Sequence, residues 1–529
     1  MAGKDPDDHR PRRAAGDSSA SDGTGGSGGS GSSGGSGSSG GSGGSGHKGS
    51  DVEPDRSTTI LPRVRDDRST TILPKTAERR RRYEEDDEED DVRPLLRERT
   101  RLILMVAGVA AVVILGLVLG YAALNVNRPA AQPSAGVSVD PSTGETATPT
   151  PVALLDDNSM IDAQMAKQID PARTWQVAST QRGLDSNSPR AACFASDPVD
   201  GQPDAQQTIQ RLLSSSGKNP PALLHQAEAY GTPEDAAQAY VAISKALGTC
   251  AVVGAWIDSG RTVSGLGDQS AAAVVAVTDA GKQTIHAIVI ARTGRVVDIV
   301  DVAQPTSAPS VGDTAAALGQ AMTVQCATSG GTCPKKLSVK NGPPPLGGDE
   351  PGFLAAGDLP PVGSTPSLWV GSTPGAPDAD YVGTGCETTD WTKVSATGKT
   401  MRTYTQQDSS SIFGVDQIIL TMSDDKAAGD VVDKVKKDLD SCSKRKLTAT
   451  VSKPVKVDGP GAENNEVTGW AAEVSQKTSS STVQFRVGIV SVGSKVIWTL
   501  ANPVDKLDFT DDQWKTIALR SGQRASQVQ

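Results

Sequence analysis

The sequence contains few aromatic residues and few histidines, and both shortages narrow the functions open to it. Phe, Trp and Tyr together make up 3% of the 529 residues, which provides neither a platform for stacking bases nor an aromatic groove for sugars. His225 and His286 are the only histidines beyond residue 50, so catalysis by a histidine base has two candidates there. No P-loop, kinase or HExxH signature occurs, and we expect a protein that is not an enzyme and uses no cofactor.

Basic residues are in the minority as well. The formal net charge is -10 at pH 7. Proteins that bind nucleic acid usually present a basic surface to the phosphates. We therefore expect no nucleic-acid partner.

Cysteine is missing from the whole first part of the chain, and all six cysteines lie beyond residue 190. This asymmetry is typical of a protein whose first part lies in the reducing interior of a cell and whose second part lies in the oxidising exterior. A zinc site is the alternative use of cysteine. It would need clustered soft ligands, but the chain has no CxxC pair, so we expect disulfides and no metal.

The first hundred residues lack the apolar side chains that a core requires. Residues 17–46 are almost entirely Gly and Ser, and four arginines at residues 79–82 precede eight acidic residues at 84–91. Such compositions do not offset chain entropy by burial. We predict a disordered cytoplasmic tail over residues 1–101.

One octapeptide, DRSTTILP, occurs twice within this tail, at residues 55–62 and 67–74. Thr58, Thr59, Thr70 and Thr71 place hydroxyls close to an arginine, which is compatible with phosphorylation. The partner would be a cytoplasmic Ser/Thr kinase or a phosphothreonine-binding protein. Drift of a recent duplication within a linker is the alternative explanation.

A single long hydrophobic run follows the tail, over residues 102–124. Its 23 residues carry no charge, and as a helix they would span roughly 34 Å, enough to cross a bilayer once. Arginines precede the run, so the positive-inside rule places the N-terminus in the cytoplasm and the C-terminus outside. Residues 125–152, rich in Pro, Ser, Thr and Ala, are predicted to form an extracellular stalk.

The part beyond the stalk repeats one pattern. Trp175 is followed by cysteines after 18 and then 57 residues, and Trp369 by cysteines after 17 and then 56. Matched spacing indicates two copies of one domain, over residues 153–335 and 353–525, with a linker at 336–352. Six cysteines allow 15 pairings, and the duplication favours one of them: Cys193 with Cys250, Cys386 with Cys442, and Cys326 with Cys333 in a small local loop.

Each copy shows the same order of local signals. Residues 223–230 and 418–422 read as strands, and each is followed by a capped amphipathic helix that ends near the second cysteine. Three strand-like segments with short turns and a final helix follow, near residues 311–324 and 511–520. We predict an α+β fold, with an antiparallel meander and helices packed on one face of the sheet.

The tryptophans divide into matched and unmatched positions. Trp175 and Trp369 recur at equivalent places and are expected to be core anchors. The unmatched tryptophans are Trp256, Trp391, Trp470, Trp498 and Trp514. Because packing persists while recognition diverges, any binding cleft is expected to use unmatched tryptophans and charged side chains between the copies.

Several segments resemble the extracellular sensor domain of the actinobacterial serine/threonine kinase PknH and its relatives. They are FLAAGDLPPVGSTPSLW, the helix ends DKVKKDLDSC and YVAISKALGTC, and the strand pairs FRVGIVSVGSKVIW and IVIARTGRVVDIV. The resemblance implies a disulfide-stabilised α+β domain facing the cell envelope, with a cleft for an extracellular ligand. Unlike those kinases, this chain has no kinase domain before the hydrophobic run, and its domain is doubled.

These observations favour a single-pass membrane protein that senses or binds an unknown extracellular ligand and signals through its tail. An envelope structural or adhesion protein is the second hypothesis. A third, an extracellular hydrolase, would depend on His225 and His286.

Overall fold

The structure is a computed structural model that describes residues 154–528, apart from 196–197, 365–366, 380 and 408–412. The predicted tail, hydrophobic span and stalk lie outside the described residues, as do Thr58, Thr59, Thr70 and Thr71. Among the residues that are described, no helix is both long and apolar enough to cross a membrane.

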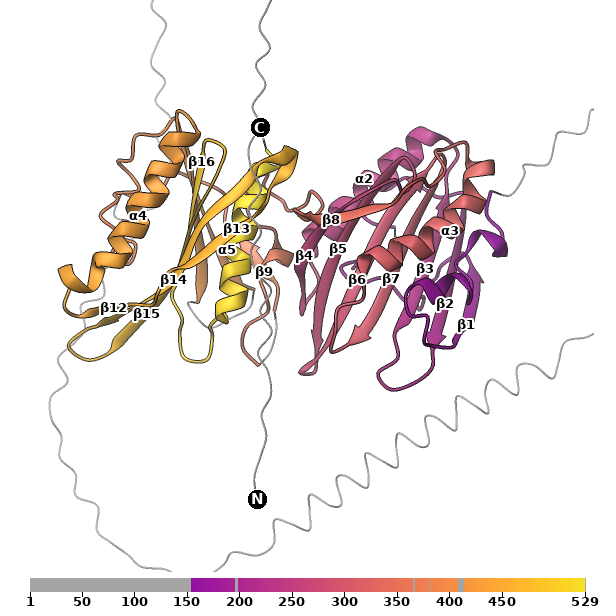
Figure 1. Ribbon diagram of the computed structural model, residues 1–529, viewed down its shortest axis with the longest axis horizontal. Coiled ribbons are helices and arrows are strands. Elements are labelled where there is room, and N and C mark those ends of the chain that lie inside the picture. Colours follow the sequence, from indigo (N-terminus) through magenta and orange to yellow (C-terminus); the bar gives the residue numbers. More distant parts are fainter. Residues whose placement is uncertain (1–153, 196–197, 365–366, 380, 408–412, 529) are drawn as a thin grey trace, which may run out of the picture. The chain divides into compact units, whose positions relative to one another are not determined.

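The first copy is built on an antiparallel sheet of eight strands in the order β1-β2-β3-β7-β6-β5-β4-β8 (Figure 1). Two short 3-10 helices, η1 (Asp157–Ser159) and η2 (Met165–Gln168), precede it, and the longer helices are α2 (Pro233–Thr249) and α3 (Val311–Ser329). The strands are β1 (Trp175–Arg182), β2 (Gln207–Ser215), β3 (Ala222–Ala229), β4 (Ala255–Ser264), β5 (Gln269–Asp279), β6 (Lys282–Thr293), β7 (Val296–Pro305) and β8 (Ser338–Gly342).

The second copy has its own sheet of eight strands, in the order β12-β14-β15-β16-β11-β10-β9, with β13 also paired to β14. Its helices are η3 (Ala356–Asp358), α4 (Asp425–Arg445), η4 (Ala462–Asn464) and α5 (Asp511–Ser526). The strands are β9 (Trp369–Gly371), β10 (Gly398–Gln406), β11 (Gly414–Thr421), β12 (Ala449–Val451), β13 (Val455–Pro460), β14 (Glu466–Lys477), β15 (Thr482–Val492) and β16 (Lys495–Ala501).

The two sheets have the same topology. The order β1-β2-β3-β7-β6-β5-β4 in the first corresponds strand for strand to β9-β10-β11-β16-β15-β14-β13 in the second. A strand irregularity recurs as well, because β4 has a register shift between Ile257 and Ser259, where the second copy has two separate strands, β12 and β13. The hydrophobic clusters of the two copies share no residue. Internal duplication predicts this arrangement.

Local sequence signals account for most of these elements. Thr232 caps α2 by accepting a hydrogen bond from the Asp235 amide, and Pro233 occupies the first turn, as predicted. Asp424 caps α4 in the same way through the Ala427 amide. The three predicted strand segments of each copy are β5, β6 and β7, and β14, β15 and β16, and all their pairings are antiparallel. The α+β class and the meander are therefore confirmed.

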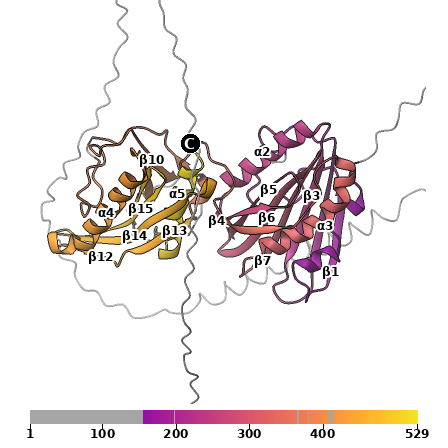
Figure 2. The same ribbon diagram turned by 45° about the horizontal axis from the view of Figure 1, so that its top comes forward.

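The prediction that the helices pack on one face of the sheet is wrong. In the first copy, α2 packs with Ile288 and Ile290 of β6, whereas α3 packs with Ala287 and Val289. Adjacent residues of a strand point to opposite faces, so the two helices cover opposite faces of the sheet (Figure 2). The second copy repeats this division, with α4 and α5 on the two faces. Each copy is thus a three-layer sandwich.

The segment predicted as a linker is partly a strand. Residues 338–342 form β8, which pairs antiparallel with β4 from Gly260 to Ser264. The first copy therefore extends beyond residue 335, and only residues 343–352 remain between β8 and the second copy. We call these ten residues, which contain PPPLGG, the joining segment.

All six cysteines are paired as predicted, in the disulfides Cys193–Cys250, Cys326–Cys333 and Cys386–Cys442. Among the described residues, no group of three or more His, Cys, Asp or Glu could hold a metal ion.

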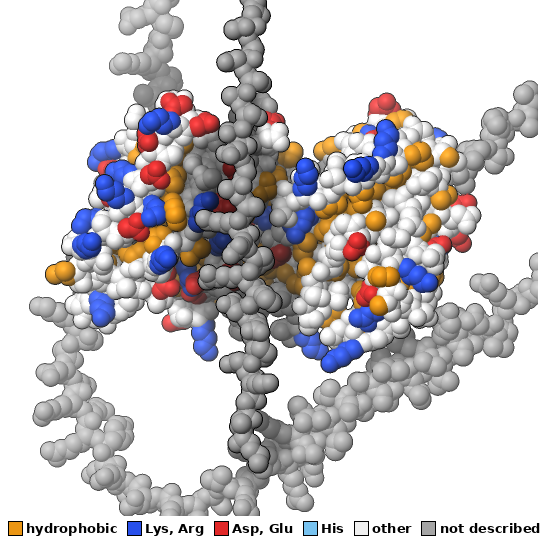
Figure 3. Space-filling model, in the orientation of Figure 1, with side chains coloured by type: hydrophobic (Ala, Val, Ile, Leu, Met, Phe, Trp, Pro, Cys, Tyr) orange, Lys and Arg blue, Asp and Glu red, His pale blue; other side chains and the backbone are white. Residues whose placement is uncertain are grey.

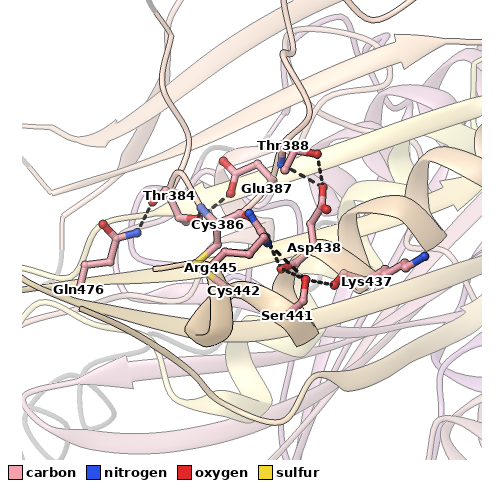
Figure 4. Close-up of a disulfide and its surroundings, with 10 residues drawn as sticks. All are labelled: Thr384, Cys386, Glu387, Thr388, Lys437, Asp438, Ser441, Cys442, Arg445 and Gln476. Atoms are coloured by element: carbon pink, nitrogen blue, oxygen red, sulfur yellow. Dashed lines mark hydrogen bonds between the residues drawn. A yellow bond between two sulfur atoms is a disulfide. The ribbon is translucent and has the colours of Figure 1, made fainter. Parts of the chain in front are cut away.

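Hydrogen bonds reinforce the disulfide of the second copy, Cys386–Cys442 (Figure 4). Arg445 on α4 donates to the carbonyl oxygen of Cys386, and Thr388 donates to the Asp438 carboxylate through both its amide (2.9 Å) and its hydroxyl (2.7 Å). The loop that carries Cys386 is therefore fixed to α4 by polar contacts as well as by the covalent bond.

Candidate functional site

The first histidine candidate, His225 of β3, is fully buried and has two partners. Its Nδ1 accepts the Ile161 amide at 3.0 Å, which places the proton on Nε2, and Nε2 then donates to Asp298 at 3.0 Å. The Asp298 carboxylate also accepts from Gln325 of α3 at 2.8 Å. His225 thereby ties the segment before β1 to the sheet and to α3.

His286, the second candidate, lies on β6 and is half-buried. Its Nδ1 is 2.9 Å from the carboxylate of Asp301 on β7, and that carboxylate also accepts the Ala192 amide at 2.8 Å. This contact holds the loop that carries Cys193 against the sheet. The two histidines bind different aspartates, and the structure does not bring them together as one site.

One cavity among the described residues has a volume of about 560 Å³. It lies where α2 and the edge of the first sheet meet the joining segment and the end of α5, so both copies contribute to it. We call it the junction cavity. Its lining residues are Tyr240, Val241, Ser244, Lys245, Arg261, Thr262, Val263, Ser270, Ala271, Pro343, Pro344, Pro345, Leu346, Gly347, Gly348, Asp349, Pro351, Gly352, Arg524, Gln527 and Val528.

The joining segment lies in direct backbone contact with the first copy. A Cβ on Gly248 of α2 would collide with the carbonyl oxygens of Pro345 and Leu346, and a Cβ on Gly260 of β4 would collide with Pro343. Gly248 does not end the helix, because α2 continues to Thr249 and Cys250 takes the left-handed capping position. Gly248 is instead required for this close approach.

A buried ion pair lies where the two copies meet, next to the joining segment. Arg524 of α5 and Asp358 of η3 have side chains 1% and 0% exposed, and two guanidinium nitrogens lie 2.7 and 3.0 Å from the two carboxylate oxygens. Arg524 also donates to the backbone oxygens of Gly248 and Pro345. A single guanidinium therefore connects the second copy to α2 and to the joining segment.

A second arginine of α5, Arg520, reaches strand β4 of the first copy. It donates to the backbone oxygens of Ile257 and Asp258, at 3.4 and 3.2 Å, where β4 has its register shift. Complete burial lowers the pKa of Arg520 to about 10. Its charge is retained at neutral pH, so it adds positive potential beside the cavity.

Asp349 is fixed by a partner in the second copy. Its carboxylate forms a bidentate pair with the buried Arg402 of β10, and this hydrogen bonding lowers the pKa of Asp349. The carboxylate is thus ionised and occupied at neutral pH. It anchors the joining segment to β10 of the second copy.

Three polar side chains on the first-copy wall, Lys245, Arg261 and Tyr240, keep bonding capacity toward the cavity. Lys245 and Arg261 form no salt bridge with any described residue, and Ser244 has no hydrogen-bond partner of good geometry in the described part of the chain. The Tyr240 hydroxyl, one turn before Ser244 on α2, is close enough to interact with it. Burial raises the pKa of Tyr240, so its hydroxyl stays protonated and can donate at neutral pH.

Most of the remaining wall is apolar. It comprises side chains from α2, the first sheet, the joining segment and the C-terminal residues, and Val241 and Leu346 on it are 58% and 64% exposed. Figure 3 shows hydrophobic side chains gathered on the side of the first copy where Figure 1 places α2 and β8. A ligand with an apolar body and a polar group would match this lining.

The sequence-based expectation for a cleft is met only in part. Charged side chains between the copies do line the cavity, but within the described part of the chain no tryptophan does. Trp391, Trp498 and Trp514 are core residues of the second copy, Trp256 is buried in the first, and Trp470 is half-buried under Lys436. The matched pair Trp175 and Trp369 are buried core residues, as predicted. The glycine-proline composition of residues 343–348 was the signal that could have marked the cavity wall.

The close packing at Gly248 can be tested by Gly248→Ala. The added methyl must push the joining segment off α2, so we expect a loss of about 1–3 kcal/mol in the free energy of unfolding. Gly429→Ala on α4 is the matched control, because a Cβ there meets no atom within 4 Å, and the substitution at this partly exposed helical position should stabilise the fold by about 1 kcal/mol or less. Denaturant titration of both variants provides the measurement. Equal effects would contradict the packing described here.

Comparison of the chain with protein-family models, with curated proteins and with solved structures gave no match.

Proposed function

We propose that this chain is a single-pass membrane protein whose two extracellular copies recognise a small-molecule ligand at the junction cavity. The observation that carries the proposal is the cavity itself. Its volume of about 560 Å³ falls within the range of small-molecule sites, roughly 300–1,000 Å³. The lining combines an apolar wall with a few polar groups whose bonding capacity is unused.

The way the junction is built supports recognition. The ion pair of Asp358 with Arg524, and that of Asp349 with Arg402, fix the walls from the second copy. Pre-formed walls reduce the ordering cost of binding. A bound ligand would contact both copies and so could change how they pack together, which gives an extracellular event a route toward the membrane.

The remaining parts of the proposal come from sequence. Residues 102–124 would cross the membrane, and the DRSTTILP motif would be read by a Ser/Thr kinase or a phosphothreonine-binding protein. The resemblance to the PknH sensor domains supports the same placement outside an actinobacterial cell. On this proposal the chain has no catalytic activity of its own.

A retention experiment tests the proposal. The fragment of residues 141–529 contains both sheets, all five core clusters and the three disulfides, so it can be studied by itself. We expect native mass spectrometry to find a small molecule retained from envelope extracts of the producing cell, and we expect that molecule to raise the melting temperature of the fragment by mass action.

Two valine variants locate the binding. Val241→Trp fills the rim of the cavity, whereas Val324→Trp adds the same side chain to α3, at an exposed valine outside the cavity. The first variant is expected to lose retention and the second to keep it. If no compound is retained by wild type, or if both variants retain it equally, the protein is better explained as a structural component of the envelope.

A further inference from the structure

The charges around the junction cavity are not balanced. Two of its lining charges are occupied, since Arg524 is paired with Asp358 and Asp349 with Arg402. Lys245 and Arg261 remain without a carboxylate partner among the described residues, and the buried Arg520 lies close enough to Arg261 for the two charges to repel. The cavity therefore holds a net positive charge on its first-copy wall. An anionic group placed there would relieve this repulsion.

A hydroxyl donor lies on the same wall. Tyr240 and Ser244 are one turn apart on α2, and residues four apart lie on the same face of a helix. The Ser244 oxygen is enclosed and lies beside the Tyr240 hydroxyl, so Tyr240 is the residue of this pair that can donate a hydrogen bond to a ligand. One hydroxyl and two cations suit a group with several acceptor oxygens, such as a carboxylate or a phosphate monoester.

The rest of the lining has the opposite character. Val263 and Ala271 on the sheet, the four prolines of the joining segment and Val528 offer apolar contact without donors. A free inorganic anion would leave the apolar lining exposed to water. A neutral hydrocarbon would leave Lys245 and Arg261 without an anionic partner. Only a molecule with an acid at one end and an apolar chain at the other matches both parts of the cavity.

We infer that the junction cavity binds a single-chain anionic amphiphile, with its acid group against Lys245, Arg261 and Tyr240 and its chain along the joining segment. The inference rests on the proposed function, because it names the ligand class for that site. The ligand binds as a monomer inside the cavity, and contact with a bilayer surface is an alternative that the test separates.

Calorimetry with four probes below their micelle concentrations tests the ligand class on the fragment of residues 141–529. Dodecanoate and dodecyl phosphate are expected to bind with one molecule per fragment. Dodecyltrimethylammonium has the same chain and the opposite charge, and it should bind at least about tenfold more weakly, since contacts to charged groups contribute about 1.5–3 kcal/mol each. Acetate, which lacks the chain, should show no measurable binding.

Charge variants test the placement of the acid group. Arg261→Gln and Lys245→Gln are each expected to weaken dodecanoate binding about tenfold, while Lys282→Gln, on an exposed residue of β6 outside the cavity, should leave it unchanged. Val241→Trp should abolish binding. All three glutamine variants are at partly or fully exposed positions, and melting curves check that they remain folded.

Three results would overturn the inference. The first is equal affinity for dodecanoate and dodecyltrimethylammonium, and the second is unchanged affinity in both Arg261→Gln and Lys245→Gln. The third is flotation of the fragment with phosphatidylglycerol vesicles that Val241→Trp does not affect, together with no binding of monomeric dodecanoate. If a neutral envelope compound is still retained in the cavity, the ligand class is wrong and the proposed function stands.

Discussion

Replacing Arg524 with methionine is expected to reduce the free energy of unfolding by about 3–5 kcal/mol, because it leaves the buried Asp358 carboxylate without its main partner. The change also removes the donor to the backbone oxygens of Gly248 and Pro345. Arg520, whose Nε is 3.8 Å from Asp358, is too distant to replace the bidentate contact. Denaturant titration of the fragment of residues 141–529 measures the effect.

A second variant distinguishes a lost contact from an uncompensated charge. Adding Asp358→Leu to Arg524→Met removes both charges, so most of the lost stability should return even though no ion pair is restored. Arg182→Met is the control, since Arg182 and Asp157 form an exposed pair with side chains 56% and 63% accessible, and it should cost less than about 1 kcal/mol. Equal losses for Arg524→Met and Arg182→Met would show that water reaches the ion pair of Arg524 with Asp358 and that this pair contributes little to the free energy of unfolding.

Removing the long-loop disulfides is the other change with a large expected effect. Replacing Cys386 and Cys442, or Cys193 and Cys250, by alanine opens loops of 56 and 57 residues, and loop entropy predicts a loss of about 4 kcal/mol for each pair. Replacing Cys326 and Cys333 opens a loop of only 7 residues and should cost about 2 kcal/mol. Denaturant titration under identical buffer conditions ranks the three double variants.

The ranking has a structural check. Around Cys386, the hydrogen bonds of Thr388 with Asp438 and of Arg445 with the Cys386 carbonyl should keep the loop on α4 after the sulfurs are removed. The native contacts then survive and the loss reflects mainly the freer unfolded chain. If the small-loop pair proved the most costly, chain entropy would not be the source of the stabilisation.

Much of the fold could be predicted because its signals are local. Helix caps such as Thr232 with Pro233 need only neighbouring residues, and alternation within a strand is equally short-ranged. The two long-loop disulfides followed from the spacing of two copies and the third from the closeness of Cys326 and Cys333 in sequence, and the structure confirms all three. The pairing of β8 with β4 could not be found in this way, since it joins residues about 80 positions apart with no turn signal between them.

The wrong prediction about the helices had a detectable signal. The centre of β6, from Ala287 to Ala291, is an unbroken apolar run and is buried throughout. Strands covered on one side alternate apolar and polar residues, whereas strands covered on both sides read as continuous apolar segments. Attention to this run would have placed α2 and α3 on opposite faces.

The candidate site was less accessible to sequence reasoning. Its lining comes from one helix, two strands, a joining segment and the end of the last helix. Which side chains meet there depends on how two complete copies pack, and no local period encodes that. The prediction that charged residues lie between the copies was correct for this cavity. The prediction that unmatched tryptophans line it was wrong, because those side chains pack in or against the hydrophobic cores.

The position of Cys250 links oxidation of the chain to the packing around the junction cavity. It terminates α2 in a left-handed conformation, and a Cβ on Gly357 would collide with its side chain, so the start of the second copy rests directly on a bridged cysteine. In a molecule whose Cys193–Cys250 disulfide has not formed, Cys250 would be less rigidly held. Its contact with Gly357, and with it the position of the neighbouring Asp358, would then be less well fixed. The oxidising capacity of the compartment would then determine how many protein molecules form an intact junction cavity, as well as how stable those molecules are.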